Sequence, residues 1–226
     1  MRKVQFANNY YYHVYNRGVD KREIFLDQND YLRFYKSLFL FNDANYFAMS
    51  GKNVESVQGL ALSNRQPLVN IASFCLMPNH YHFLLEQICD NGITSFMHSL
   101  STSYTQYFNL KNDRTGRLFE GPFKAVLVKR DAQLEHLPRY IHLNPLDLTD
   151  VNWREGKGED WAKAEKLLEE YPWSSHNVYL GKPQQLPVVE KSVIGQIFNT
   201  PEKYKIFLKQ WGGREIAGLS PFEDRA

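Results

Sequence analysis

The chain has 226 residues, of which 43% are hydrophobic and 23% charged, an ordinary balance for one sizeable soluble core. Its formal net charge of +2 is too small to indicate a nucleic-acid partner by itself. The two cysteines lack metal-ligand spacing and no apolar run approaches membrane-spanning length, which argues against a disulfide scaffold or a membrane protein, and we expect a cytoplasmic location.

The first part of the chain shows a strand, a helix and a long connection. Residues 10–16 are aromatic and β-branched, which favours a strand. We expect Asp30 to cap a helix that runs to about Phe41. Residues 42–68 are rich in Asn, Ser, Gly and Gln, which is typical of a long excursion over the surface.

A strand pair and a second helix follow. Residues 68–77 and 80–87 have strand patterns, and Pro78-Asn79 between them makes a tight turn. Strands joined so closely are neighbours and antiparallel. Apolar residues then recur with helical spacing over 93–110.

The last core elements complete a recognisable order. Residues 123–129 alternate as a strand, Asp131 caps another helix, and Pro145 ends it. The order predicts an α+β fold, a ferredoxin-like βαββαβ antiparallel sheet with helices on one face and strands one and three central. We expect residues 1–150 to form this core and residues 151–226 to form a helical C-terminal extension packed on it.

Two histidines on the strand 80–87 are the most informative residues of the chain. Because side chains alternate along a strand, His80 and His82 share one face while Tyr81 points to the other. Two neutral imidazoles side by side are suitable ligands for a divalent metal. A buried histidine pair can also be purely structural, so the metal hypothesis depends on what lies beside it.

A second pattern lies on the helix that begins at Asp131. Tyr140 and Asn144 are four residues apart and therefore share a helix face, whereas His142 points elsewhere. Beside the two histidines they would supply a nucleophile and an oxygen ligand. A tyrosine with a pKa near ~10 is a poor nucleophile and needs a nearby metal or base. This donor set suits Mn²⁺ or Mg²⁺, and Zn²⁺ also fits.

Other residues compete for these roles. Tyr104 and Tyr107 are alternative nucleophiles on the preceding helix, but their apolar stripe favours core packing. His13 on the first strand could lie beside the site, although a hydrogen-bonded core histidine is the simpler interpretation.

Basic residues gather between residues 111 and 130, where six stand against two acidic ones. On charge alone, a phosphate-binding face and an ordinary solvated loop explain this stretch equally well. The candidate phosphate contacts are Arg17, Arg114, Arg117, Lys124 and Lys129.

These pieces together resemble the IS200-like single-tyrosine (Y1) transposases of the HUH single-strand DNA nuclease superfamily. Within that family the chain is most similar to the REP-associated tyrosine transposases. The resemblance rests on Met-Pro-Asn-His-Tyr-His at 77–82, Arg-Tyr-Ile-His-Leu-Asn-Pro at 139–145 and Tyr-Pro-Trp-Ser-Ser at 171–175. Further matching pieces stand at 13–18 and 116–124.

The resemblance, which runs from about residue 10 to 180, implies a divalent metal cofactor (Mg²⁺ or Mn²⁺) and a single-stranded DNA partner cleaved beside a hairpin. It implies that Tyr140 attacks the scissile phosphate and forms a 5′-phosphotyrosine with a free 3′-OH. It further implies that His80, His82 and Asn144 are the metal ligands. Both a monomer and a homodimer are compatible with it, and we expect no membrane partner.

Three residues depart from the family pattern. Tyr81 stands where a smaller aliphatic residue is usual, but it faces away from the expected metal. Pro122 replaces an arginine and Glu120 replaces a glutamine, and both changes remove favourable phosphate contacts. A domesticated DNA-hairpin-binding protein without cleavage activity is therefore a second hypothesis. A hydrolytic metallophosphodiesterase, which would use water and need no tyrosine, is a third.

Overall fold

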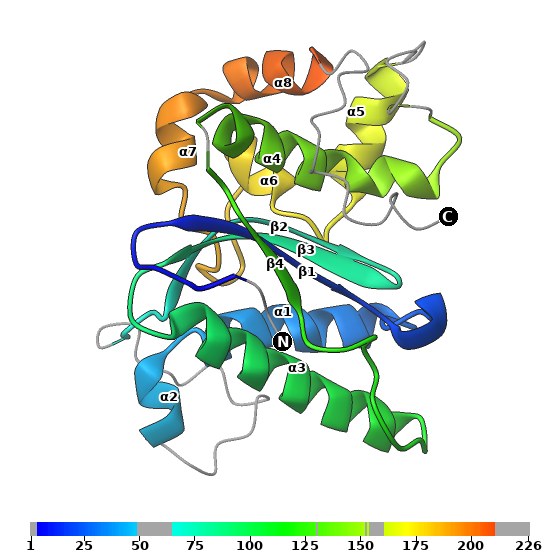
Figure 1. Ribbon diagram of the computed structural model, residues 1–226. Helices are drawn as coiled ribbons and strands as arrows, with labels where there is room; N and C mark the ends of the chain where they lie inside the picture. Colours follow the sequence, from blue (N-terminus) through cyan, green and yellow to red (C-terminus); the bar gives the residue numbers. More distant parts are fainter. Residues whose placement is uncertain (1–3, 49–64, 130, 152, 154–160, 211–226) are drawn as a thin grey trace.

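The computed structural model describes residues 4–48, 65–129, 131–151, 153 and 161–210. A four-stranded sheet lies between two layers of helices (Figure 1), so the α+β prediction is confirmed. The strands, in the order β2-β3-β1-β4 with antiparallel neighbours, are β1 (Tyr11–Arg17), β2 (Val69–Met77), β3 (His80–Gln87) and β4 (Lys124–Leu127). Strands β1 and β3 are central, as the sequence predicted.

Helices α1 (Gln28–Phe41) and α3 (Gly92–Lys111) cover one face of the sheet (Figure 1). This face is aromatic, because Phe34 of α1 packs with its ring centroid 5.5 Å from that of Tyr81 and 6.4 Å from that of Phe83. All three side chains are fully buried. Burying a large apolar side chain contributes about 1.5–3 kcal/mol, so this layer is a main source of stability.

Helix α4 (Asp131–Leu143) lies on the opposite face of the sheet, together with η4 (Asn144–Leu148) and α6 (His176–Tyr179) (Figure 1). The prediction of helices on one face therefore holds for α1 and α3 but not for α4. The physical reason is visible in β2, which is buried at every position except Asn70. A strand buried on both faces requires cover on both.

The C-terminal segments also cover the outer edge of β2. The backbone N–H of Leu76 donates to the carbonyl of Trp173 at 2.9 Å, and that of Ser175 donates to the carbonyl of Phe74 at 3.0 Å. The helices in this region are α5 (Trp161–Glu170), α7 (Ser192–Ile197) and α8 (Pro201–Lys209). A division of the chain at residue 150 stays a prediction.

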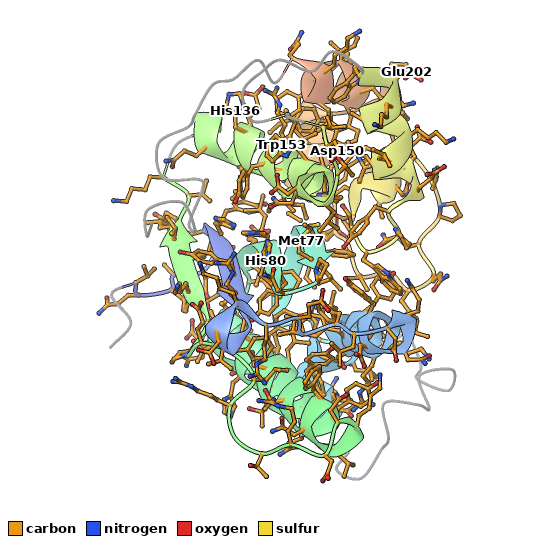
Figure 2. All side chains as sticks on the ribbon, turned by 90° about the vertical axis from the view of Figure 1, so that its right-hand side faces the viewer. Met77, His80, His136, Asp150, Trp153 and Glu202 are labelled. Carbon is orange, nitrogen blue, oxygen red and sulfur yellow. The ribbon has the colours of Figure 1, made fainter. Side chains whose placement is uncertain are left out.

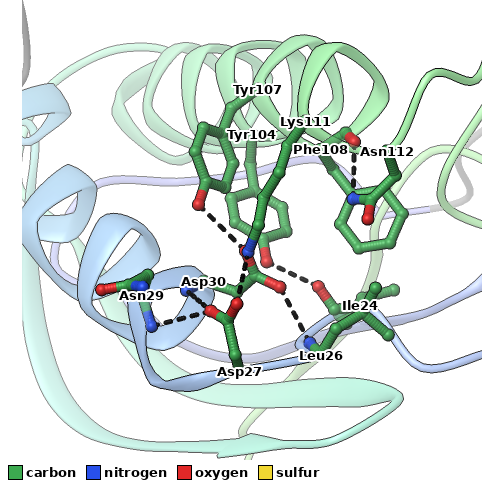
Figure 3. Close-up of polar contacts among 10 residues, drawn as sticks. All are labelled: Ile24, Leu26, Asp27, Asn29, Asp30, Tyr104, Tyr107, Phe108, Lys111 and Asn112. Carbon is green, nitrogen blue, oxygen red and sulfur yellow. Dashed lines mark hydrogen bonds and ion pairs between the residues drawn. The ribbon is translucent and has the colours of Figure 1, made fainter.

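The start of α1 differs from the prediction, because Asp27 and not Asp30 is the cap. The Asp27 carboxylate accepts the backbone N–H of Asp30 at 3.1 Å. Asp30 is instead fully buried and accepts from the Leu26 N–H at 2.8 Å, the Tyr107 hydroxyl at 2.9 Å and the Lys111 ammonium at 2.6 Å (Figure 3). A carboxylate in the first turn of a helix also interacts favourably with the helix dipole.

Two shorter elements precede and follow α1, namely η1 (Val19–Lys21) and α2 (Ala44–Ala48). The second of these lies within the expected excursion over residues 42–68, of which residues 49–64 lie outside the described part. Within the described part of the chain, no helix combines the length and apolarity that a membrane crossing requires.

Candidate active site

The two histidines of β3 point toward the layer of α4. His82 is fully buried and His80 is half-buried, and their ring centroids lie 5.0 Å apart with the planes nearly perpendicular. Figure 2 shows His80 in the sheet layer, with Trp153 in the layer of helices above it. The alternation along the strand thus brings the imidazoles together on the face that carries no aromatic layer from α1 and α3.

One nitrogen of His80 is already engaged by its neighbour in sequence. The Asn79 amide oxygen lies 2.6 Å from His80 Nδ1, while the Asn79 amide nitrogen donates to the carbonyl of Lys21 at 3.2 Å. Because an amide oxygen only accepts, His80 carries its proton on Nδ1. Its Nε2 then presents a lone pair, the arrangement that metal-ligating histidines adopt.

His82 has a different partner, an imidazole on the neighbouring strand. His13 Nε2 lies 3.0 Å from His82 Nδ1, and His13 is itself buried. Burial lowers the pKa of His13 to about 3, so its ring is neutral at pH 7. His13 is therefore a hydrogen-bonded core histidine, as the sequence favoured, and it also lies directly beside the site.

Tyr140 of α4 packs against the imidazoles of His82 and His13. Its ring centroid lies 5.4 Å from that of His82 and 5.9 Å from that of His13, and its plane stands nearly perpendicular to both. Only 3% of its surface is exposed. The phenol-bearing helix and the imidazole-bearing strand therefore meet within one chain.

Asn144 follows directly after α4, as the first residue of η4. It is buried, and its amide nitrogen donates to the backbone carbonyl of Tyr140 at 2.7 Å. That bond satisfies a carbonyl that the helix end leaves without an intrahelical partner. Since the nitrogen is engaged, only the amide oxygen of Asn144 could serve as a metal ligand.

The donor set limits which metal chemistry is reasonable. No group of three or more His, Cys, Asp or Glu side chains in the described ranges is arranged to hold a metal ion. Two imidazoles with Nδ1 engaged fit a site that takes its further donors from oxygen, such as an amide, water or phosphate. The residues present therefore fit a site for a divalent ion that is completed by oxygen ligands.

The other side of α4 is held by a buried network that the sequence analysis missed. His142 Nε2 lies 2.6 Å from Ser175 Oγ, and His142 Nδ1 lies 2.8 Å from Tyr204 Oη. Ser175 Oγ also accepts the backbone N–H of Phe74 at 2.8 Å, which ties the helix to β2. Tyr204 in turn contacts His176 Nδ1 at 2.8 Å. His142 thus lies away from the candidate metal site, as predicted, and anchors α4.

Burial perturbs the titration of this network. It lowers the pKa of His176 to about 4 and holds the pKa of His142 well below its usual value. Both rings are therefore neutral at physiological pH.

Two of the five candidate phosphate contacts lie beside the imidazoles. Arg17 is directly opposite His80 in the pairing of β1 with β3. Lys124 is opposite Tyr15, which is opposite His82, and its ammonium lies 5.9 Å from the Tyr15 ring centroid.

The other three are placed differently. The Arg114 guanidinium donates to the Asn109 side chain at 2.7 Å and to the carbonyl of Arg117 at 3.4 Å, which stabilises the loop after α3. Arg117 and Lys129 are exposed. The structure therefore does not gather all five residues around the histidines.

The alternative nucleophiles are on the wrong face. The Tyr104 hydroxyl donates to the carbonyl of Ile24 at 2.5 Å, and the Tyr107 hydroxyl donates to Asp30 (Figure 3). Both belong to the layer of α1 and α3, so the packing role that their apolar stripe indicated is the one the structure gives them.

The chain is similar to a known family in sequence and to a solved structure in fold. Residues 61–144 match the family model of IS200-like transposases. A solved structure of a REP-associated tyrosine transposase bound to a REP hairpin superposes with a TM-score of 0.52 at 12% identity, over 84% of this chain and 96% of that one. No curated protein matches the chain in sequence. The resemblance to IS200-like transposases is therefore confirmed over residues 61–144, within a fold that a REP-associated tyrosine transposase shares.

Proposed function

We propose that the protein is a metal-dependent tyrosine transposase that cleaves and rejoins single-stranded DNA at hairpin-flanked sites. The observation that carries this proposal is the approach of Tyr140 to His82, with ring centroids 5.4 Å apart in one chain. The family match over residues 61–144 supports the class of enzyme. The REP hairpin in the similar solved structure supports a DNA hairpin as partner.

In this proposal His80 and His82 would hold Mg²⁺ or Mn²⁺ through Nε2, and the amide oxygen of Asn144 would be the third protein ligand. Such an ion, when bound, would polarise a phosphate oxygen and stabilise the negative charge of the transition state. The protein holds the two imidazoles in place through Asn79 and His13.

Tyr140 supplies the nucleophile. Its phenol loses the proton to solvent, and Oη attacks the scissile phosphorus to form a new P–O bond. The bond from phosphorus to the 3′ oxygen breaks, and that oxygen takes up a proton to become a free 3′-OH. The resulting 5′-phosphotyrosine retains a phosphodiester, so attack by a 3′-OH can rejoin strands without ATP.

Basic side chains would hold the DNA backbone next to this site. Arg17 and Lys124 lie beside the imidazoles and are the stronger candidates. Arg114, Arg117 and Lys129 would contact DNA farther from the scissile phosphate. Contacts of this kind position the DNA and make binding sensitive to salt.

The decisive experiment incubates the protein with Mn²⁺ and a labelled hairpin oligonucleotide and then separates the products on a denaturing gel. The wild-type protein should form a covalent adduct, and Tyr140→Phe should form none while still shifting the DNA in a native gel. Tyr107→Phe is the matched control on the other face of the sheet and should retain the adduct. An adduct formed by Tyr140→Phe would show that another residue is the nucleophile.

In this proposal one chain supplies the nucleophile and all protein ligands of its active site, so subunits do not share sites. A mixture of Tyr140→Phe and His82→Ala proteins should therefore form no adduct. Restored adduct in the mixture would show that a homodimer shares its sites between subunits.

A second candidate, a hairpin-binding protein without cleavage activity, is favoured by one specific observation. The Glu120 carboxylate lies 3.5 Å from the Lys124 ammonium and so offsets the charge of a candidate phosphate contact. The adduct experiment separates the two functions, since a native-gel shift without any adduct from the wild-type protein would support the binding protein.

A further inference from the structure

We infer that His13 is a positioning residue that orients the proton of His82 so that His82 can bind a metal. The inference deepens the proposed function and rests on its assignment of His82 as a ligand. It concerns the hydrogen bond between His13 Nε2 and His82 Nδ1, which are 3.0 Å apart.

A hydrogen bond between two imidazole nitrogens holds one proton, and its direction decides what His82 can do. When His82 Nδ1 donates to His13 Nε2, the other nitrogen of His82 carries a lone pair and can bind a metal. When His13 Nε2 donates, the proton of neutral His82 is on Nε2 and ligation there is blocked. Only the first direction is compatible with a metal at His82, and it requires that His13 carries its own proton on Nδ1.

The fold holds His13 firmly in this position. Its strand pairs with β3, where His13 is opposite Leu84 and two residues along from the partner of His82. Diagonal neighbours of this kind contact each other on one face of a sheet. The rings of Tyr15 and Tyr140 pack against His13 with centroid distances of 5.0 and 5.9 Å. The His13 and His82 rings are nearly parallel, with an angle of 24°.

His80 differs from His82 in the hydrogen-bond partner of its Nδ1 atom. Its Nδ1 faces the Asn79 amide oxygen, which only accepts, so the proton of His80 has one possible location. His13 can either accept or donate, so the state of His82 depends on its tautomer. Binding of a divalent ion at His82 Nε2 must therefore set the protons of both rings, including the ring that does not touch the ion.

Nuclear magnetic resonance of the ¹⁵N-histidine-labelled wild-type protein tests the inference without any variant. With saturating Mg²⁺ and no DNA, long-range ¹H–¹⁵N spectra should show the protons of His13 and His82 on Nδ1 in both rings. A proton on Nε2 of His13 in the Mg²⁺-loaded protein would overturn the inference.

Two substitutions test its energetic consequence through Mn²⁺ affinity, measured by electron paramagnetic resonance. His13→Phe removes the acceptor and should weaken Mn²⁺ binding about 10–100-fold, the usual cost of losing such a partner. His13→Gln places an amide where the Nε2 atom lies and should recover most of the affinity. His98→Phe, on the exposed side of α3, is the control and should bind as the wild type does.

Wild-type affinity in a folded His13→Phe protein would contradict the inference. If the His13→Phe protein does not fold, the Mn²⁺ affinity of His13→Gln and the wild-type spectra still test the inference. These measurements use no DNA, so an absent adduct would refute the proposed transposase activity and leave the role of His13 intact.

Discussion

The two faces of the sheet both bury rings but use them differently. The face under α1 and α3 is built from Phe and Tyr rings, such as Phe34 against Tyr81. The face under α4 carries His13, His82 and Tyr140, whose rings pack edge-on or side by side. The first face stabilises the fold, and the second places groups with lone pairs and hydroxyls next to one another.

The faces also differ in how they satisfy buried polar groups. Asp30, under α3, forms an ion pair with Lys111 and accepts hydrogen bonds from two neutral donors (Figure 3). The α4 layer uses neutral imidazoles that exchange hydrogen bonds with hydroxyls and with each other, as in His142 with Ser175. A neutral network costs less to bury than a charge, but it loses its hydrogen bonds when an imidazole is protonated.

The largest effect is expected from the aromatic face. Phe34→Ala should lower the free energy of unfolding by about 3–5 kcal/mol, because the side chain is fully buried against other rings. Urea titration followed by circular dichroism measures this. The Mn²⁺ affinity of the folded variant should remain that of the wild type, and a clear loss would show that the faces are coupled.

Acid should act mainly on the α4 face. His176 has a pKa of about 4 when folded against 6.5 when unfolded, so the unfolded chain binds more protons between these values and stability falls as the pH falls. This histidine alone should cost about 1.5 kcal/mol between pH 6.5 and pH 5. Urea unfolding at the two pH values measures the loss, and His176→Asn should reduce it. If the wild type were equally stable at pH 6.5 and pH 5, the lowered pKa of His176 would be contradicted.

The carboxylate under α3 should give a smaller effect than Phe34→Ala. Asp30→Ala removes the acceptor of the Leu26 N–H and the Tyr107 hydroxyl, and should cost about 1–2 kcal/mol, while Lys111 retains Asp27 as a partner. Thermal unfolding measures it, with the exposed Glu170→Ala as a neutral control. A loss as large as that of Phe34→Ala would mean that Lys111 does not compensate.

The smallest effect is expected for Lys124 and Glu120, which lie beside the site. Lys124→Ala should reduce the salt dependence of hairpin binding by about 0.7–0.9 in the slope of log K against log[salt], as one phosphate contact is lost. Glu120→Gln removes the carboxylate that pairs with Lys124 and should strengthen binding at low salt. Fluorescence anisotropy over a NaCl series measures both, and an unchanged slope for Lys124→Ala would exclude it from the DNA contact.

The sequence predicts the local parts of this architecture well. The period of two in β3 places His80 and His82 on one face, and the helical period in α4 separates Tyr140 from His142. Both patterns depend on neighbours within a few residues. The start of α1 was missed because Asp27 and Asp30 are both suitable caps and only the burial of Asp30 distinguishes them.

What the sequence could not predict depends on long-range placement. Amphipathicity identifies α4 as a helix but does not say which face of the sheet it covers. The contact of His13 with His82 joins residues 69 positions apart and follows only from the register of β1 on β3. The anchoring of His142 by Ser175 and Tyr204 likewise requires the C-terminal helices to be in place.

The pairing of Trp173 and Ser175 with β2 has a consequence for how the molecule behaves in a crowded solution. An uncovered outer strand recruits foreign polypeptide and seeds fibrils, and β2 is long and apolar enough to do so. In this protein the outer edge of β2 is already paired with Trp173 and Ser175 of the same chain. Truncation before residue 171 would expose that edge to other chains. Such a shortened protein should precipitate more readily than the full chain.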